Sequence, residues 1–123
     1  MNTAICDDER ENREKLGCAV TAFFTEKEVP VSLTYFPKGS ELLNSVKSGT
    51  EYDVIFMDIN LVTEDGISII AELRSLGCAV PVIFVTSYEN RAIDGYDVDA
   101  FAFVVKKNMG EKLPRVLRKL YSQ

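Results

Sequence analysis

The sequence contains no histidine and no tryptophan among its 123 residues. Without histidine, hydrolysis by a Ser-His-Asp or Cys-His arrangement is excluded, and a zinc site of the usual Cys/His kind is not expected. The three cysteines, Cys6, Cys18 and Cys78, are widely and irregularly spaced. We therefore expect buried, reduced thiols in place of disulfides or metal ligands.

Long apolar runs and an excess of basic residues are also lacking. No apolar stretch approaches the ~20 residues that span a bilayer, and the N-terminus carries no secretory signal, so we expect a cytoplasmic protein. With 19 acidic and 14 basic residues the net charge is −5. That balance opposes binding to anionic lipid or to nucleic acid, so this chain alone is not expected to bind membranes or DNA.

The composition that is present is typical of a globular domain. Hydrophobic residues make up 46% and charged residues 27% of the chain, and this length fits one ordinary domain. No internal repeat or linker interrupts it, so residues 1–123 are expected to form a single domain.

Short apolar runs alternate with longer amphipathic segments along the whole chain. The segments 54–57 and 82–85 are continuously apolar, which is typical of strands buried on both faces of a parallel sheet. We expect strands at about 3–6, 31–36, 54–57, 82–85 and 102–105, and helices at about 9–27, 40–48, 66–76, 89–96 and 110–121. Ser40 is expected to cap the second helix, and Leu76 to face the core. This alternation predicts a doubly wound α/β fold of the flavodoxin-like kind: a five-stranded parallel sheet with helices on both faces.

Ligands of such sheets bind beyond the carboxyl ends of the strands. Polar side chains follow four of the expected strands there: Asp7 and Asp8, Asp58, Thr86, and Lys106. Each has an ordinary structural explanation as well. The first two could cap a helix, Asp58 could begin a turn, Thr86 could simply end its strand, and Lys106 could be solvated.

Three carboxylates gathered at one edge would repel one another unless a cation neutralised them. Mg²⁺ prefers hard oxygen ligands and uses one or two carboxylates with several waters. Asp8 and Asp58 could ligate it directly with a backbone carbonyl just past Asp58, while Asp7 could hold a metal-bound water. The Asp58 carboxylate is then a suitable nucleophile for phosphoryl transfer, with Lys106 and Thr86 contacting the phosphoryl oxygens.

These residues resemble the receiver domains of two-component response regulators. The resemblance spans essentially the whole chain and is carried by Ile5-Cys6-Asp7-Asp8-Glu9, by residues Asp53 to Leu61 with Asp65-Gly66, by Val82 to Ser87, and by Phe103-Val104-Val105-Lys106. The Asp-Asp-Glu opening and the Asp58-Ile59-Asn60-Leu61 segment look most like regulators whose output is a LytTR-type DNA-binding domain, which this chain does not contain.

The resemblance implies roles for individual residues. Asp58 would be the phosphoacceptor, and Asp7, Asp8, Asp58 and the Asn60 carbonyl would bind Mg²⁺ or Mn²⁺. Thr86 and Lys106 would contact the phosphoryl group, Phe103 would be the switch aromatic, and Tyr88 would tune hydrolysis. Phe103 could equally be plain core.

The resemblance also implies partners and a limited activity. The donor would be a sensor histidine kinase, and the domain would promote its own phosphorylation and dephosphorylation without being a conventional enzyme. The surface formed by the fourth helix, the fifth strand and the last helix would change on phosphorylation, could form a homodimer, and would control an output, with transcription the expected one.

Two positions depart from the family pattern. The usual proline after the lysine is Lys107 here, so we predict a trans Lys106–Lys107 bond and an altered loop. A frequent proline four residues after the phosphoacceptor is Val62 here. Lys107 leaves open a pseudo-receiver, an interaction module that never carries phosphate.

Two further alternatives have less support. A metal-dependent phosphohydrolase would usually carry a second acid where Asn60 stands, and a flavin-binding domain would need a phosphate loop after the first strand.

Overall fold

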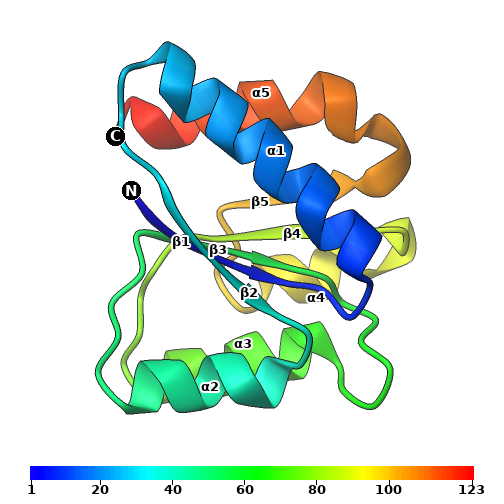
Figure 1. The fold of residues 1–123 in the computed structure, drawn as a ribbon. Helices are drawn as coiled ribbons and strands as arrows, with labels where there is room; N and C mark the ends of the chain where they lie inside the picture. The colour runs from blue at the N-terminus through cyan, green and yellow to red at the C-terminus, as the bar shows by residue number, and fades with distance from the viewer.

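A five-stranded parallel sheet forms the centre of the molecule (Figure 1). The computed structural model describes all residues, 1–123. Its strands lie in the order β2-β1-β3-β4-β5. They are β1 (Asn2–Cys6), β2 (Ser32–Phe36), β3 (Val54–Met57), β4 (Val82–Thr86) and β5 (Ala102–Val105), and all neighbouring pairs are parallel. The predicted fold class is confirmed.

The helices cover both faces of this sheet. They are α1 (Arg10–Glu26), α2 (Gly39–Lys47), α3 (Gly66–Ser75), α4 (Ala92–Tyr96) and α5 (Met109–Tyr121). In Figure 1, α1 and α5 lie on one face and α2 and α3 on the other, with α4 near the β5 edge. Short 3-10 turns, Glu89–Arg91 and Lys106–Asn108, precede α4 and α5.

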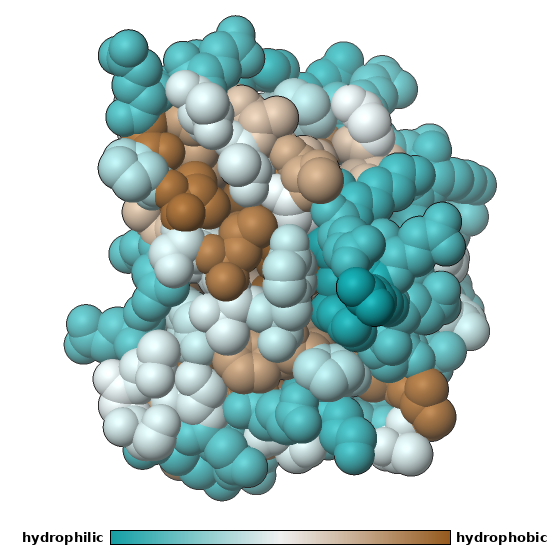
Figure 2. All heavy atoms as spheres, in the orientation of Figure 1, coloured by the Kyte–Doolittle hydropathy of each residue, from teal (hydrophilic) through white to brown (hydrophobic).

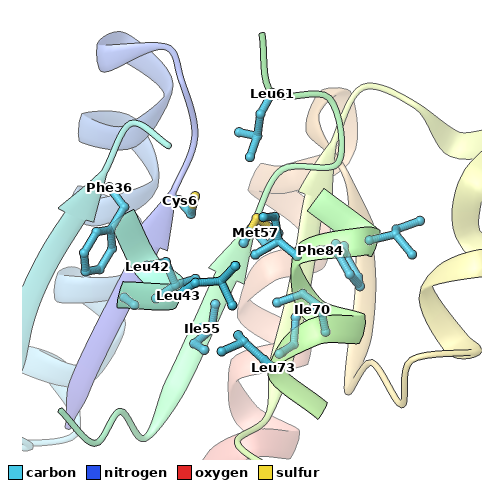
Figure 3. Close-up of a cluster of buried hydrophobic side chains, with 14 of the residues drawn as sticks. Cys6, Phe36, Leu42, Leu43, Ile55, Met57, Leu61, Ile70, Leu73 and Phe84 are labelled. Carbon is cyan, nitrogen blue, oxygen red and sulfur yellow. The ribbon is translucent and has the colours of Figure 1, made fainter. Parts of the chain in front are cut away.

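Burial follows these two layers. One apolar cluster joins the sheet to α2 and α3 and includes Leu42, Met57 and Leu73 (Figure 3). The other joins the opposite face to α1 and α5 and includes Phe24 and Leu113. Every residue of β3 and β4 is buried, which explains why the sequence of these strands shows no polar alternation.

Three details of the helices differ from the sequence-based expectation. Ser40 does not cap α2, because the helix begins at Gly39 after Lys38, and neither provides a side-chain cap. Leu76 lies just past the end of α3 and is 52% exposed. The segment expected as one short helix is a 3-10 turn followed by α4. These errors concern the ends of helices, where the exact boundary shifts easily by one or two residues.

The cysteines are free, as expected, but they are not uniformly buried. Cys6 is buried, Cys78 is half-buried and Cys18 is exposed on α1. The expectation of a buried thiol was therefore wrong for Cys18, whose position on the outer face of an amphipathic helix allows any small side chain.

Arg74 fastens the end of the sheet that is remote from the carboxyl edge. Its guanidinium group donates hydrogen bonds of 2.7–3.1 Å to four backbone carbonyls: those of Cys78, Val80, Val98 and Asp99. One planar group with five N–H donors thus ties α3 to the start of β4 and to the loop after α4.

The surface is divided unequally between polar and apolar areas. In Figure 2, hydrophobic atoms gather on the left over β2, and hydrophilic atoms cover the right, toward which the strands run in Figure 1. No helix has both the length and the apolar character that crossing a bilayer requires.

Candidate functional site

Three carboxylates meet at the carboxyl ends of β1 and β3. Asp7 and Asp8 follow β1 directly, and Asp58 follows β3. Oxygens of Asp7, Asp8 and Asp58 lie within 4.8 Å of one another. The strand ladder continues into these residues, because the amide of Asp7 donates to Phe36 O at 3.1 Å and that of Asp58 to Cys6 O at 3.0 Å. The cluster sits between β1 and β3, where the strand order reverses and ligands of such folds bind.

Lys106 joins this cluster from the end of β5. Its Nζ lies 2.9 Å from a carboxylate oxygen of Asp7 and 2.9 Å from one of Asp58. The side chains of the two acids are 6% and 7% exposed, and that of Lys106 is 20% exposed. No peptide bond is cis, so the predicted trans Lys106–Lys107 bond is confirmed. Lys107 in the place of proline therefore leaves Lys106 directed into the cluster.

The electrostatics of the cluster are only partly balanced by Lys106. Burial raises the pKa of Asp7, although hydrogen bonds from the Glu9 amide and from Lys106 act in the opposite direction. Burial alone would lower the pKa of Lys106, but the hydrogen bonds to Asp7 and Asp58 raise it above its ordinary value. With all groups ionised, three carboxylates and one ammonium carry a net charge of −2.

Cys6 directly precedes the acids but contributes no anion to them. Burial raises the pKa of its thiol, and the nearby charges of Glu64, Asp7 and Asp58 raise it further. The thiol therefore stays protonated, so the donors at this edge are hard oxygen atoms. A set of carboxylate oxygens with net charge −2 fits a small divalent cation such as Mg²⁺ or Mn²⁺.

The loop after β3 folds back on itself and presents Asn60 beside the acids. An isolated antiparallel bridge pairs Asn60 with Asp65, and the Gly66 amide donates to Ile59 O at 2.6 Å. A side chain at Gly66 would collide with the backbone carbonyl of Asp58, so glycine is required where α3 begins. The Asn60 amide donates to a carboxylate oxygen of Asp58 at 3.3 Å.

Thr86 and Tyr88 form the wall next to this loop. Thr86 is fully buried at the end of β4, and its hydroxyl accepts a hydrogen bond from the Tyr88 amide at 3.3 Å. The Tyr88 ring is 47% exposed, and its hydroxyl accepts a 3.1 Å hydrogen bond from the Asn60 side chain. Tyr88 thus connects the loop after β4 with the loop after β3.

Phe103 lies on β5 and is half-buried. It packs against the α2/α3 cluster, with its ring centroid 6.2 Å from that of Phe84. A side chain at Gly95 of α4 would come within 3.3 Å of the Phe103 ring. The aromatic ring therefore fills the space between the sheet and α4, a position compatible with both core packing and a switch.

Sequence reasoning assigned no role to three charged residues around the site. Asp65 caps α3 by accepting the Ile67 amide at 3.1 Å, and it also pairs with Arg91 at 3.1 Å. The carboxylate of Glu64 accepts hydrogen bonds from the amides of α2. Asp65 could have been recognised as a cap before an apolar helix. Arg91 pairs with Asp94 three residues away at 2.8 Å, but its contact with Asp65 and those of Glu64 with α2 span more than 20 residues, and no local pattern signals them.

The chain belongs to the response regulator receiver domain family of two-component systems, whose family model matches residues 3–118. Among curated proteins it is similar to the positive alginate biosynthesis regulatory protein of Pseudomonas aeruginosa, with 29% identity over 119 residues, 97% of this chain and 46% of that protein. It is also similar to the sensory transduction protein LytR of Staphylococcus haemolyticus, with 29% identity over 123 residues, 100% of this chain and 46% of that protein. The chain thus spans about half the length of these relatives.

Solved structures of response regulator domains share this fold. The response regulatory domain of mrkE from Klebsiella pneumoniae superposes with a TM-score of 0.86 at 20% identity, covering 99% of this chain and 96% of that one. The response regulator TrrA of Thermotoga maritima, solved in complex with Mg(2+)-BeF, gives 0.76 at 24% identity and covers 97% of each chain.

Proposed function

We propose that the chain is a phosphorylation switch in which Asp58 accepts a phosphoryl group from the phosphohistidine of a sensor histidine kinase. The observation that carries this proposal is the position of Lys106, whose ammonium group contacts Asp58 and Asp7 among three clustered carboxylates. A carboxylate oxygen of Asp58 attacks phosphorus, the bond between phosphorus and the histidine nitrogen breaks, and an aspartyl phosphate forms.

Mg²⁺ or Mn²⁺ is the cofactor that this site fits. Asp8, Asp58 and the Asn60 backbone carbonyl would hold the ion, and Asp7 would hold one of its waters. When bound, the ion neutralises the oxygens of the transferring phosphoryl group. The net charge of −2 in the cluster, with a protonated Cys6 behind it, supports this donor set.

Lys106 and Thr86 would stabilise the phosphorylated state. Lys106 neutralises the Asp58 carboxylate in the unmodified protein and would exchange that partner for a phosphoryl oxygen. The Thr86 hydroxyl is already at the end of β4 and would donate to another oxygen. Each new charge-assisted hydrogen bond contributes ~1.5–3 kcal/mol. Shifting a population from 1:99 to 99:1 needs ~5.5 kcal/mol, which two wholly new bonds at the upper end would just supply. Because Lys106 already bonds Asp58, its exchange contributes only the difference between the two partners.

The change would reach the surface through Phe103. Movement of Thr86 toward the phosphoryl group frees space next to β4, into which the half-buried Phe103 ring can turn. This alters the surface of α4, β5 and α5. Ile93 and Tyr96 of α4 are 77% and 57% exposed, which supports this surface as the place where two phosphorylated copies associate.

Tyr88 would limit the access of water to the phosphoryl group. Its ring is held across the loop after β3 by the hydrogen bond from Asn60. A bulky ring fixed at this point obstructs the approach of a nucleophilic water, so the aspartyl phosphate would hydrolyse slowly.

The output would be regulation of transcription by a LytTR-type DNA-binding domain in a longer cytoplasmic protein. The support is the similarity to proteins named LytR and LytT and to the alginate regulatory protein, of which this chain matches about half. The receiver itself, with its charge of −5, would not contact DNA directly.

Intact-mass measurement after incubation with acetyl phosphate and Mg²⁺ tests this proposal. The wild type should gain ~80 Da, the mass of one phosphoryl group, while Asp58→Asn and wild type with EDTA should gain nothing. A wild type that gains no mass would favour the pseudo-receiver, and an equal gain in Asp58→Asn would place the phosphoryl group elsewhere.

A further inference from the structure

Glu64 connects the loop after β3 to the beginning of α2. Its two carboxylate oxygens accept hydrogen bonds from the Gly39 amide at 2.7 Å and the Ser40 amide at 3.0 Å. These are the first two amides of the nine-residue helix α2, where unpaired N–H groups and the helix dipole favour a negative charge. Glu64 thus provides the cap that the sequence of α2 itself lacks.

The backbone of the same loop is closed by its own hydrogen bonds. The Leu61 amide donates to Glu64 O at 3.2 Å and the Glu64 amide to Leu61 O at 3.4 Å, next to the bridge between Asn60 and Asp65. Leu61 is buried, whereas Val62 at the tip is 82% exposed. Asn60 and Glu64 therefore belong to one small hairpin, and fixing Glu64 fixes the backbone of Asn60.

Three polar side chains attach this hairpin to the rest of the molecule. Asn60 bonds to Tyr88 and Asp65 pairs with Arg91, and both partners lie in the segment after β4 that the proposed switch moves. Asp65 also caps α3, the helix that directly follows the hairpin, and Glu64 alone attaches the hairpin to α2, which is distant in the sequence and outside that segment. In the proposed switch the attachment to α2 would stay in place while those to Tyr88 and Arg91 change.

We propose that Glu64 is a positioning residue for the divalent cation, holding the Asn60 carbonyl at the acidic cluster through its cap on α2. This inference rests on the proposed function, because it assigns the Asn60 carbonyl to the ion. Outer residues that orient metal ligands typically contribute 10–100-fold to metal affinity. Because Leu61 also anchors the hairpin, the lower end applies, and Glu64→Ala should weaken ion binding about tenfold.

Binding of Mn²⁺, measured from the EPR signal of the free ion and by competition with Mg²⁺, tests this role. Glu64→Ala removes both acceptor oxygens, while Glu64→Gln keeps one and should lose less affinity. Glu41→Gln is the matched control, because Glu41 is exposed in the first turn of α2 and its loss changes the charge equally without touching the hairpin. Glu41→Gln should bind Mn²⁺ within about twofold of wild type.

Hydrogen exchange of the Gly39 and Ser40 amides supplies a second readout. Both amides should exchange faster in Glu64→Ala, together with the backbone of residues 60–65. If they do and Mn²⁺ affinity stays unchanged, the positioning role is wrong while the proposed function stands. If Glu41→Gln and Glu64→Gln weaken binding equally, charge alone acts and the role is again wrong. Failure of wild type to bind either ion would instead overturn the proposed function. Should Glu64→Ala not fold, Glu64→Gln decides.

Discussion

Replacing Lys106 with methionine removes the one cation that contacts the carboxylates of Asp7 and Asp58. Those side chains are 6% and 7% exposed, so water can replace the ammonium group only in part. Removing one partner of a buried ion pair costs ~3–5 kcal/mol. Lys106 itself is one-fifth exposed, which favours the lower end, ~3 kcal/mol. For a domain of this size, that loss lowers Tm by roughly 10 °C.

Magnesium should return most of this stability. At a concentration 100 times its Kd, a ligand of the folded state stabilises by ~2.7 kcal/mol, close to the loss. The gain with Mg²⁺ should be larger in Lys106→Met than in wild type, because Lys106 no longer competes for the same oxygens. Thermal denaturation followed by circular dichroism, with and without Mg²⁺, measures both effects. Equal Mg²⁺ stabilisation of the two proteins would refute this reasoning.

Acidic pH should also reduce the defect. Burial already raises the pKa of Asp7, and loss of Lys106 raises it further. A carboxylic acid whose pKa is higher in the folded than in the unfolded state carries its full destabilising cost above the folded pKa. That cost decreases as the pH falls through the folded pKa and is gone below the unfolded pKa. Lys107→Met is the control, and it should change stability by at most ~1 kcal/mol. Lys107 is 67% exposed, and its ion pair with Glu89 is long, at 3.5 Å.

Four further substitutions test the packing and the switch. Thr3→Val should stabilise the protein by ~1 kcal/mol in urea unfolding, because the buried Thr3 hydroxyl has no hydrogen-bond partner; a loss of stability would reveal a missed partner. Gly66→Ala should destabilise it by ~1–3 kcal/mol through collision with the Asp58 carbonyl, and unchanged urea unfolding would contradict that geometry. Phe103→Ala should leave acetyl phosphate labelling intact but abolish phosphorylation-dependent dimerisation in sedimentation; full dimerisation would exclude the aromatic coupling. Tyr88→Ala should shorten the lifetime of the 80 Da adduct in a mass time course, whereas an unaltered lifetime would remove its shielding role.

The sheet and the acidic cluster could be predicted because their signals are local. Uninterrupted apolar runs such as Val54–Met57 identify buried strands, and the parallel order brings the residues that follow them to one edge. The positions of Asp7, Asp58 and Lys106 required no knowledge of side-chain conformation, only of strand ends. The contact of Lys106 with both acids follows from that convergence.

Helix ends and inter-loop contacts could not be predicted in the same way. A serine at the start of α2 is an ordinary capping signal, yet the cap comes from Glu64, 24 residues beyond Ser40. Arg91 likewise pairs with Asp65 across two loops. Such contacts depend on how loops are placed after the layers have packed, and a single sequence holds no periodicity that specifies them.

The two ends of α4 are held unequally, because Arg74 donates hydrogen bonds to carbonyls that lie just after the helix. The carbonyls of Val98 and Asp99 accept hydrogen bonds from the Arg74 guanidinium group, which also donates to Val80 O just before β4. The leading end is held by the ion pairs of Arg91 with Asp65 and of Glu89 with Lys107 and by the hydrogen bond between Asn60 and Tyr88. The two ion pairs are open to solvent and correspondingly weak. A conformational change that begins at the acidic edge would therefore act on a helix that is held firmly at its C-terminal end. In the proposed switch the helix would turn about Val98, and the largest displacement would fall on the residues closest to Asp58.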